Sequence, residues 1–106
     1  MLNDVSFLQS EAANVVDGII ANIEAMLDLH CVHADLSPYN ILYWDERIHI
    51  IDFPQAIDPR GNPAAMTLLS RDVENICRWA AKAGVVRHAG AIASDLWRRF
   101  AVGAIG

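Results

Sequence analysis

The sequence predicts an α+β fold that is mainly helical and contains one short β-hairpin. Apolar residues recur at intervals of three and four in three segments, which is the period of an amphipathic helix. Two short β-prone runs lie between the first and second of these segments. A chain of 106 residues can form one compact domain, which buries roughly two-thirds of its unfolded surface, but not two. We therefore expect residues 1–106 to form a single unit.

The first helix is expected over residues 9–29. Ser10, followed by Glu11, is a candidate N-cap. Gly18 weakens a helix by roughly 1 kcal/mol relative to Ala, but the length of the segment and its apolar stripe outweigh this cost. The stripe consists of Val15, Ile19, Ile23, Met26 and Leu27.

The hairpin is expected from two β-prone runs, at 41–44 and 48–51, which are separated by Asp45, Glu46 and Arg47. Two strands alone are marginally stable in water. The first helix is therefore expected to cover them.

Pro54, Pro59 and Gly61 exclude regular structure between the hairpin and the next helix, so residues 52–62 should form an irregular connection. Asn62 and Pro63 have the character of an N-cap and a first-turn proline. A second helix is expected over 63–83 and a third over 88–102, with Gly84 ending the second. Their buried positions should be Leu68, Leu69, Val73, Ile76 and Trp79 or Ala80 in the second, and Ile92, Leu96, Trp97 and Phe100 in the third.

Composition narrows the range of partners. A net charge of −5 and a pI near 5.1 have the wrong sign for an electrostatic nucleic-acid binder. The 54% hydrophobic content and mean hydropathy of +0.23 exceed the globular average, which suggests an apolar face that packs against another lobe or a partner chain.

Cysteine usage and the absence of targeting signals indicate a cytoplasmic protein. Cys31 and Cys77 lie in apolar segments without a CxxC pair, so we expect both to be reduced and buried. No apolar run reaches about 18 residues, and the N-terminus lacks the basic region of a signal peptide, so neither a membrane span nor a leader is expected.

Polar residues cluster where the two strands begin and end. A hairpin places the start of its first strand beside the end of its second, so Asn40 and Asp52 should be neighbours. One amide oxygen and one carboxylate suit Mg²⁺, which fills its other positions with phosphate oxygens and water. Asp35, in the preceding loop, would orient or deprotonate an attacking hydroxyl. These residue types predict phosphoryl transfer.

The run His33-Ala34-Asp35-Leu36-Ser37-Pro38-Tyr39-Asn40, followed by Ile51-Asp52-Phe53, resembles the catalytic loop and metal-binding motif of protein kinases. Within the kinases, Asp35-Leu36-Ser37, Tyr39-Asn40-Ile41-Leu42, Ile51-Asp52-Phe53-Pro54-Gln55 and Arg71-Asp72-Val73-Glu74-Asn75-Ile76 are similar to RIO-type serine/threonine kinases. The resemblance extends from Cys31 to Trp79. It implies the C-terminal lobe of a kinase fold, in which a short hairpin carries the catalytic and metal-binding loops.

The resemblance also implies residue roles. Asp35 would be the catalytic base, and Asn40 and Asp52 would bind Mg²⁺ or Mn²⁺. Ser37 would lie near the transferred phosphate, with ATP as the donor substrate and a Ser or Thr hydroxyl of a protein as the acceptor. In some RIO proteins the metal-binding aspartate accepts phosphate transiently, so Asp52 is also a candidate phosphoacceptor in an ATPase-like cycle.

Two further residues would support the loop. By the same resemblance, Asp72 would hydrogen-bond the catalytic-loop backbone and His33 would pack beneath it. Pro54 stands where ordinary kinases have glycine, which restricts a flip of that segment.

No Gly-rich phosphate loop, strand lysine or helix glutamate precedes the first helix. The expectation is therefore a C-lobe without its N-lobe, and this argues against autonomous kinase activity.

Two alternatives stay open. A small-molecule phosphotransferase of the aminoglycoside type shares the His-x-Asp-x-x-x-x-Asn pattern and a later Ile-Asp, although Ser37 and the Pro54-Gln55 pair argue against it. A catalytically idle half-kinase that acts as an interaction module is favoured by the missing lysine and glycine loop.

Other chemistry-bearing residues have simpler explanations. His30, Cys31 and His33 suit zinc but lack a fourth ligand at sensible spacing. Tyr39 and Trp44 are expected in the core rather than stacked on a base, as are Trp79, Trp97 and Phe100. The cations Lys82, Arg87, Arg98 and Arg99 are expected on a solvated face.

Overall fold

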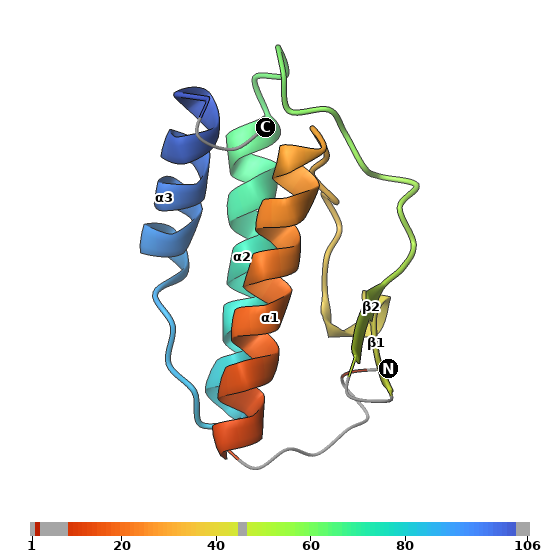
Figure 1. Cartoon of the computed structure of the whole chain (residues 1–106), viewed down its shortest axis with the longest axis vertical. Helices are drawn as coiled ribbons and strands as arrows, with labels where there is room; N and C mark the ends of the chain where they lie inside the picture. Colours follow the sequence, from red (N-terminus) through yellow and green to blue (C-terminus); the bar gives the residue numbers. More distant parts are fainter. Residues whose placement is uncertain (1, 3–8, 45–46, 104–106) are drawn as a thin grey trace.

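Three helices lie side by side, and a two-stranded antiparallel hairpin packs beside the first of them (Figure 1). This computed structural model describes residues 2, 9–44 and 47–103. The expected α+β architecture, mainly helical with one hairpin, is confirmed. The elements in chain order are α1 (Gln9–Asp28), the 3₁₀ turn η2 (Pro38–Asn40), β1 (Ile41–Trp44), β2 (Arg47–Ile50), α2 (Ala65–Lys82) and α3 (Ala89–Ala101).

Helix α1 forms where its apolar stripe predicted. Its buried positions are Ala12, Val15, Val16, Ile19, Ile23 and Leu27. The prediction of Ser10 as N-cap is wrong, because the helix already begins at Gln9 and places Ser10 inside its first turn. Gly18 faces the hairpin, where a Cβ atom would lie 2.9 Å from Cδ1 of Ile48. The glycine therefore allows β2 to approach the helix closely.

The hairpin pairs Ile41 with Ile50 and Trp44 with Arg47. Strand β2 begins and ends one residue earlier than expected, and the turn residues 45–46 lie outside the described residues. One further hydrogen bond follows the last pair, from N of Ile51 to O of Asn40 at 2.8 Å. Asp52 then adopts a left-handed φ of 60°, which turns the chain away from the ladder.

The connection from the hairpin to α2 runs along the outside of the molecule (Figure 1). It contains an antiparallel bridge between Val32 and Ile57, with two backbone hydrogen bonds of 2.9 Å. Asn62 caps a turn rather than the helix, because its side chain accepts from N of Ala64 at 2.9 Å. Helix α2 therefore starts at Ala65, two residues later than expected.

Helices α2 and α3 complete the core. Gly84, with a φ of 85°, follows the end of α2 as predicted. Leu69, Val73 and Ile76 of α2 belong to one buried apolar cluster with residues of α1, and Ala93 and Leu96 of α3 belong to the same cluster. Trp79 is buried, while Trp97 and Phe100 are partly buried against the core.

The structure also bears on the two cysteines and on membrane-spanning helices. Both cysteines are free; Cys77 is buried as expected, but Cys31 is only half-buried because it lies in the loop after α1. No helix in the described ranges combines the length and apolar character needed to cross a membrane.

Candidate active site

The polar loop, residues 29–40, connects α1 to the hairpin and carries most of the predicted site residues. Its backbone takes left-handed φ values at two residues that are not glycine, 56° at His30 and 72° at Ala34. Such conformations cost of order 1–3 kcal/mol each and persist only where surrounding contacts hold them. The contacts that hold this loop come from α2 and from the segment after β2.

Asp72 of α2 holds the loop backbone. Its Oδ2 accepts from N of Ala34 at 2.8 Å, and its Oδ1 accepts from N of Leu36 at 3.0 Å. Asp72 is almost fully buried. Burial raises the pKa of its carboxyl, although the two backbone N–H groups and nearby His33 act in the opposite direction. The side chain thus occupies the position that the kinase resemblance implied.

Asn75 adds a second attachment that the sequence analysis missed. Its Nδ2 donates to the carbonyl of Leu36 at 3.0 Å. Asp72 and Asn75 are separated by three positions, which puts them on the same face of α2. The sequence signal that could have revealed this contact was a polar residue three positions after Asp72, on the helix face that meets the loop.

His33 supports the loop from beneath, as expected. It is fully buried, and its Nε2 lies 2.9 Å from O of Ile51. Its Nδ1 accepts from N of Asp35 at 3.2 Å, so the ring proton is assigned to Nε2, which donates to Ile51. The ring of Phe53 covers His33 with a centroid distance of 4.8 Å. His33 therefore ties the polar loop to the chain around Asp52.

The three residues predicted to carry the chemistry lie in adjoining segments at one end of the hairpin. The hydrogen bond from Ile51 to Asn40 places Asp52 one residue beyond the partner of Asn40. Asp35 and Asp52 are both exposed to solvent, and Asn40 is half-buried. The backbone of Asp35 is fixed by His33 and lies between the two residues that Asp72 holds.

Ser37 organises the turn before β1. Its Oγ accepts from N of Tyr39 at 3.2 Å, which caps η2, and donates to Oδ1 of Asn40 at 2.9 Å. This bond orients the carboxamide of Asn40 while leaving its oxygen a second lone pair. The predicted contact between Ser37 and the transferred phosphate stays a prediction.

Tyr39 is not in the core, contrary to expectation. Tyr39 is 61% exposed and lies in the middle of η2, none of whose residues is buried. The side chain of Trp44 lies outside the described residues.

Three of the four cations assigned to a solvated face form ion pairs. Arg87 pairs with Asp17, Arg98 with Asp95, and Arg99 with Glu24 and Asp95. Lys82 instead lines a cavity beside the polar loop.

The oxygen donors of Asn40 and Asp52 fit a hard divalent cation such as Mg²⁺. In the described ranges, no three side chains of His, Cys, Asp or Glu are grouped closely enough to hold a metal ion. A metal held by Asn40 and Asp52 would therefore take its remaining ligands from phosphate and water, which is how Mg²⁺ binds in nucleotide sites.

Comparisons with known proteins agree with the resemblance that the sequence motifs indicated. A sequence profile described as the RIO domain matches residues 1–91. Serine/threonine-protein kinase rio1 of Schizosaccharomyces pombe is 32% identical over 76 residues, covering 71% of this chain and 15% of that protein. Serine/threonine-protein kinase RIO3 of Caenorhabditis elegans is 36% identical over 81 residues, covering 74% and 16%. RIO-type serine/threonine-protein kinase Rio1 of Thermoplasma acidophilum is 35% identical over 71 residues, covering 67% and 37%. The chain thus spans between 15% and 37% of these relatives.

Proposed function

The chain belongs to the RIO domain family, and on this basis we propose that it carries the catalytic loop and metal ligands of a RIO-type serine/threonine kinase. The reaction is the transfer of the γ-phosphate of ATP to a Ser or Thr hydroxyl of a protein. Asp35 serves as the base, and Asn40 and Asp52 hold Mg²⁺ or Mn²⁺.

The observation that carries this proposal is the junction at the end of the hairpin. The backbone N–H of Ile51 donates to the backbone carbonyl of Asn40, so Asp52 is the residue after the strand partner of Asn40. This supports a metal site shared by the Asn40 carboxamide and the Asp52 carboxylate. When bound, the metal ion neutralises charge on the phosphates of ATP. Asn40 and Asp52 then fix where the phosphate chain lies relative to the polar loop.

Hydrogen bonds to the backbone around Asp35 explain how its carboxylate can act on a hydroxyl. The backbone of Ala34 and Leu36 is held by Asp72, and that of Asp35 by His33. The exposed carboxylate is thus presented from a fixed backbone, and less ordering entropy remains to be lost when a hydroxyl binds. Asp35 accepts the proton of that hydroxyl as it attacks.

Titration of the chain with Mn²⁺–ATP tests the metal site, because Mn²⁺ broadens the NMR signals of nearby amides even when binding is weak. ATP-dependent broadening is expected for Asn40 and Asp52. Asp52→Asn should weaken binding at least tenfold, since it removes the anionic ligand. Asp58→Asn is the matched control, because Asp58 lies in the same connection but pairs with Arg60.

The expected result for Asp58→Asn is an unchanged titration. If a chain with a native-like NMR spectrum shows no broadening at Asn40 and Asp52, or if both variants lose binding equally, the metal assignment is wrong. The interaction-module alternative would then be preferred.

A further inference from the structure

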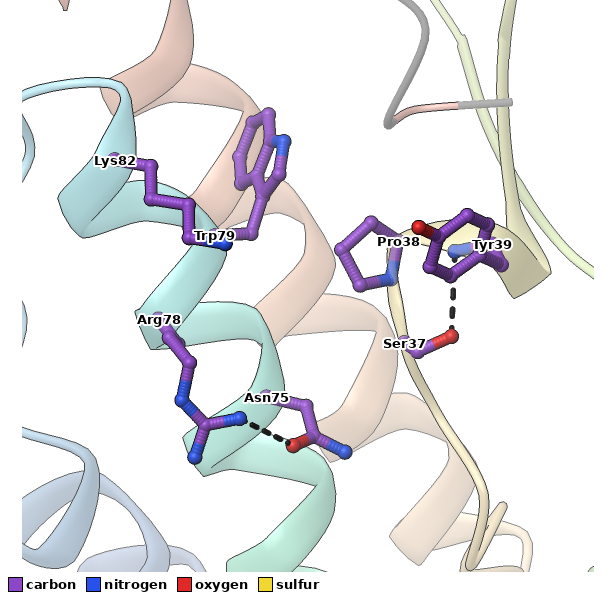
Figure 2. A pocket seen from close by; sticks show the side chains of 7 residues that line it. All are labelled: Ser37, Pro38, Tyr39, Asn75, Arg78, Trp79 and Lys82. Carbon is purple, nitrogen blue, oxygen red and sulfur yellow. Dashed lines mark hydrogen bonds between the residues drawn. The ribbon is translucent and has the colours of Figure 1, made fainter.

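A cavity of about 260 Å³ lies between the polar loop and helix α2 (Figure 2). Residues 37–39 line it on the loop side, and Asn75, Arg78, Trp79 and Lys82 line it on the α2 side. The roles proposed for Asp35, Asn40 and Asp52 make no use of this cavity. The side chains that line it indicate which kind of ligand it can bind.

The cavity is cationic in a chain whose net charge is −5. Arg78 and Lys82 are four positions apart, so they lie on the same side of α2. Among the residues that the structure describes, no carboxylate lines the cavity and neither cation forms an ion pair, even though Glu74 is one turn before Arg78. Arg78 donates to Oδ1 of Asn75 at 3.1 Å, a neutral acceptor. Within the described part of the chain, the cavity therefore offers two positive groups without a counterion.

Apart from Ser37 and Asn75, the rest of the lining is apolar or aromatic. Pro38 faces Trp79 across the gap (Figure 2). Trp79 is buried, and Tyr39 is 61% exposed. A free inorganic anion gains little from such a wall. An acidic side chain on a peptide gains from both parts, since its methylene groups and backbone pack on the rings while its carboxylate meets the cations.

The cavity also lies close to the proposed base. Ser37 follows Asp35 by two residues, so their Cα atoms are at most about 7 Å apart. Asn75 contributes to the cavity lining and also holds the carbonyl of Leu36, between these two residues. An extended peptide with a hydroxyl at Asp35 reaches the cavity with a side chain two or three residues away.

We propose that this cavity is a specificity pocket for an Asp or Glu side chain of the acceptor protein, two or three residues from its Ser or Thr hydroxyl. The placement of the hydroxyl rests on the proposed function. The binding of an acidic side chain does not.

Fluorescence anisotropy with labelled peptides tests the charge preference. One peptide carries a single Ser with Glu two and three residues to either side, and its partner carries Gln at those positions. The Glu peptide should bind at least tenfold more tightly. Arg78→Gln and Lys82→Gln should each reduce this preference several-fold, and the double variant should abolish it.

Arg71→Gln is the matched control, because Arg71 is also exposed on α2 but does not line the cavity. It should change the preference by less than twofold. Equal affinity for the two peptides overturns the proposal. So does a preference that Arg71→Gln reduces as much as Arg78→Gln, because this would show attraction to overall charge.

Two further measurements separate this pocket from the metal site. A nitroxide attached at the acceptor position of the Glu peptide should broaden the amide signals of Asp35 and Asn40; broadening elsewhere overturns the placement. Mn²⁺–ATP titrations of the Arg78 and Lys82 variants should match the unaltered chain. A preference for Glu without Mn²⁺–ATP binding would contradict the proposed function and support the pocket, whereas the reverse result would contradict the pocket alone.

Discussion

The carboxylate of Asp72 accepts two backbone N–H groups from a loop that precedes it by 38 and 36 residues. Both acceptor oxygens are used, and the group is buried, which raises its pKa. An aspartate here pays a desolvation cost that a neutral side chain would avoid. Two backbone hydrogen bonds offset this cost, because only a carboxylate offers an acceptor oxygen to each of the two N–H groups.

Asp72→Asn is expected to destabilise the fold by about 1–3 kcal/mol, since an amide NH₂ would face one backbone N–H and leave it unpaired in a buried place. Urea denaturation measures this loss. Hydrogen exchange should become faster at the amide of Ala34 or Leu36, whichever loses its acceptor. Glu74→Gln, an exposed change on the same helix, should leave stability and both amides unchanged; equal effects of the two substitutions would contradict the role of Asp72.

At the scale of the element, α1 and β2 approach each other where the helix has no side chain. A Cβ atom at Gly18 would meet Cδ1 of Ile48 at 2.9 Å, closer than ordinary contact. Helix propensity alone disfavours glycine by roughly 1 kcal/mol. Gly18 thus lowers the intrinsic stability of the helix but allows the hairpin that carries the candidate site to pack closely against it.

A double-mutant cycle tests whether the contact with Ile48 offsets the gain in helix propensity. Gly18→Ala alone should change the free energy of unfolding little, because the gain in propensity is offset by displacement of Ile48. In an Ile48→Val background, which removes Cδ1, the same change should stabilise the chain by about 1 kcal/mol. Gly90→Ala in α3, where added atoms meet open space, should show no coupling to Ile48. An identical effect of Gly18→Ala in both backgrounds would contradict the close contact.

For the whole molecule, two kinds of contact join the helices. A shared apolar core links α1, α2 and α3. At the surface, Arg99 of α3 pairs with Glu24 of α1, and Arg87, in the connection between α2 and α3, pairs with Asp17 of α1. The exposed large apolar residues lie in separate parts of the chain, most of them in connections between elements: Leu29, Tyr39, Phe53, Met66, Val86 and Val102. The apolar face for a partner lobe or chain stays a prediction.

Core burial should outweigh the surface ion pairs in stability. Ile76→Ala, at a fully buried position of α2, is expected to cost about 2–5 kcal/mol through lost apolar contact and the cavity left behind. Arg87→Gln and Arg99→Gln should each cost less than about 1 kcal/mol, because exposed pairs are screened and entropically costly. Denaturation curves of the three variants give the comparison, and an arginine variant less stable than Ile76→Ala would reverse this ranking.

The sequence by itself determined the elements and the motif residues. Helix and strand periodicity depends on residues within a few positions of one another, so the helices and the hairpin were found to within two residues. The hairpin also predicted that Asn40 and Asp52 are neighbours; the structure pairs Asn40 with Ile51, one residue before Asp52. The roles of Asp72 and His33 came from the family resemblance and not from the pattern of residues around them.

Only the tertiary structure decided which distant groups meet. The bond of Asn75 to Leu36, the bridge between Val32 and Ile57, and the cavity between α2 and the polar loop each join segments at least 25 residues apart. Tyr39 is exposed, although its aromatic character favoured the core. The physical reason is that such contacts depend on how helices pack in space, whereas local periodicity specifies only which face of each element is apolar.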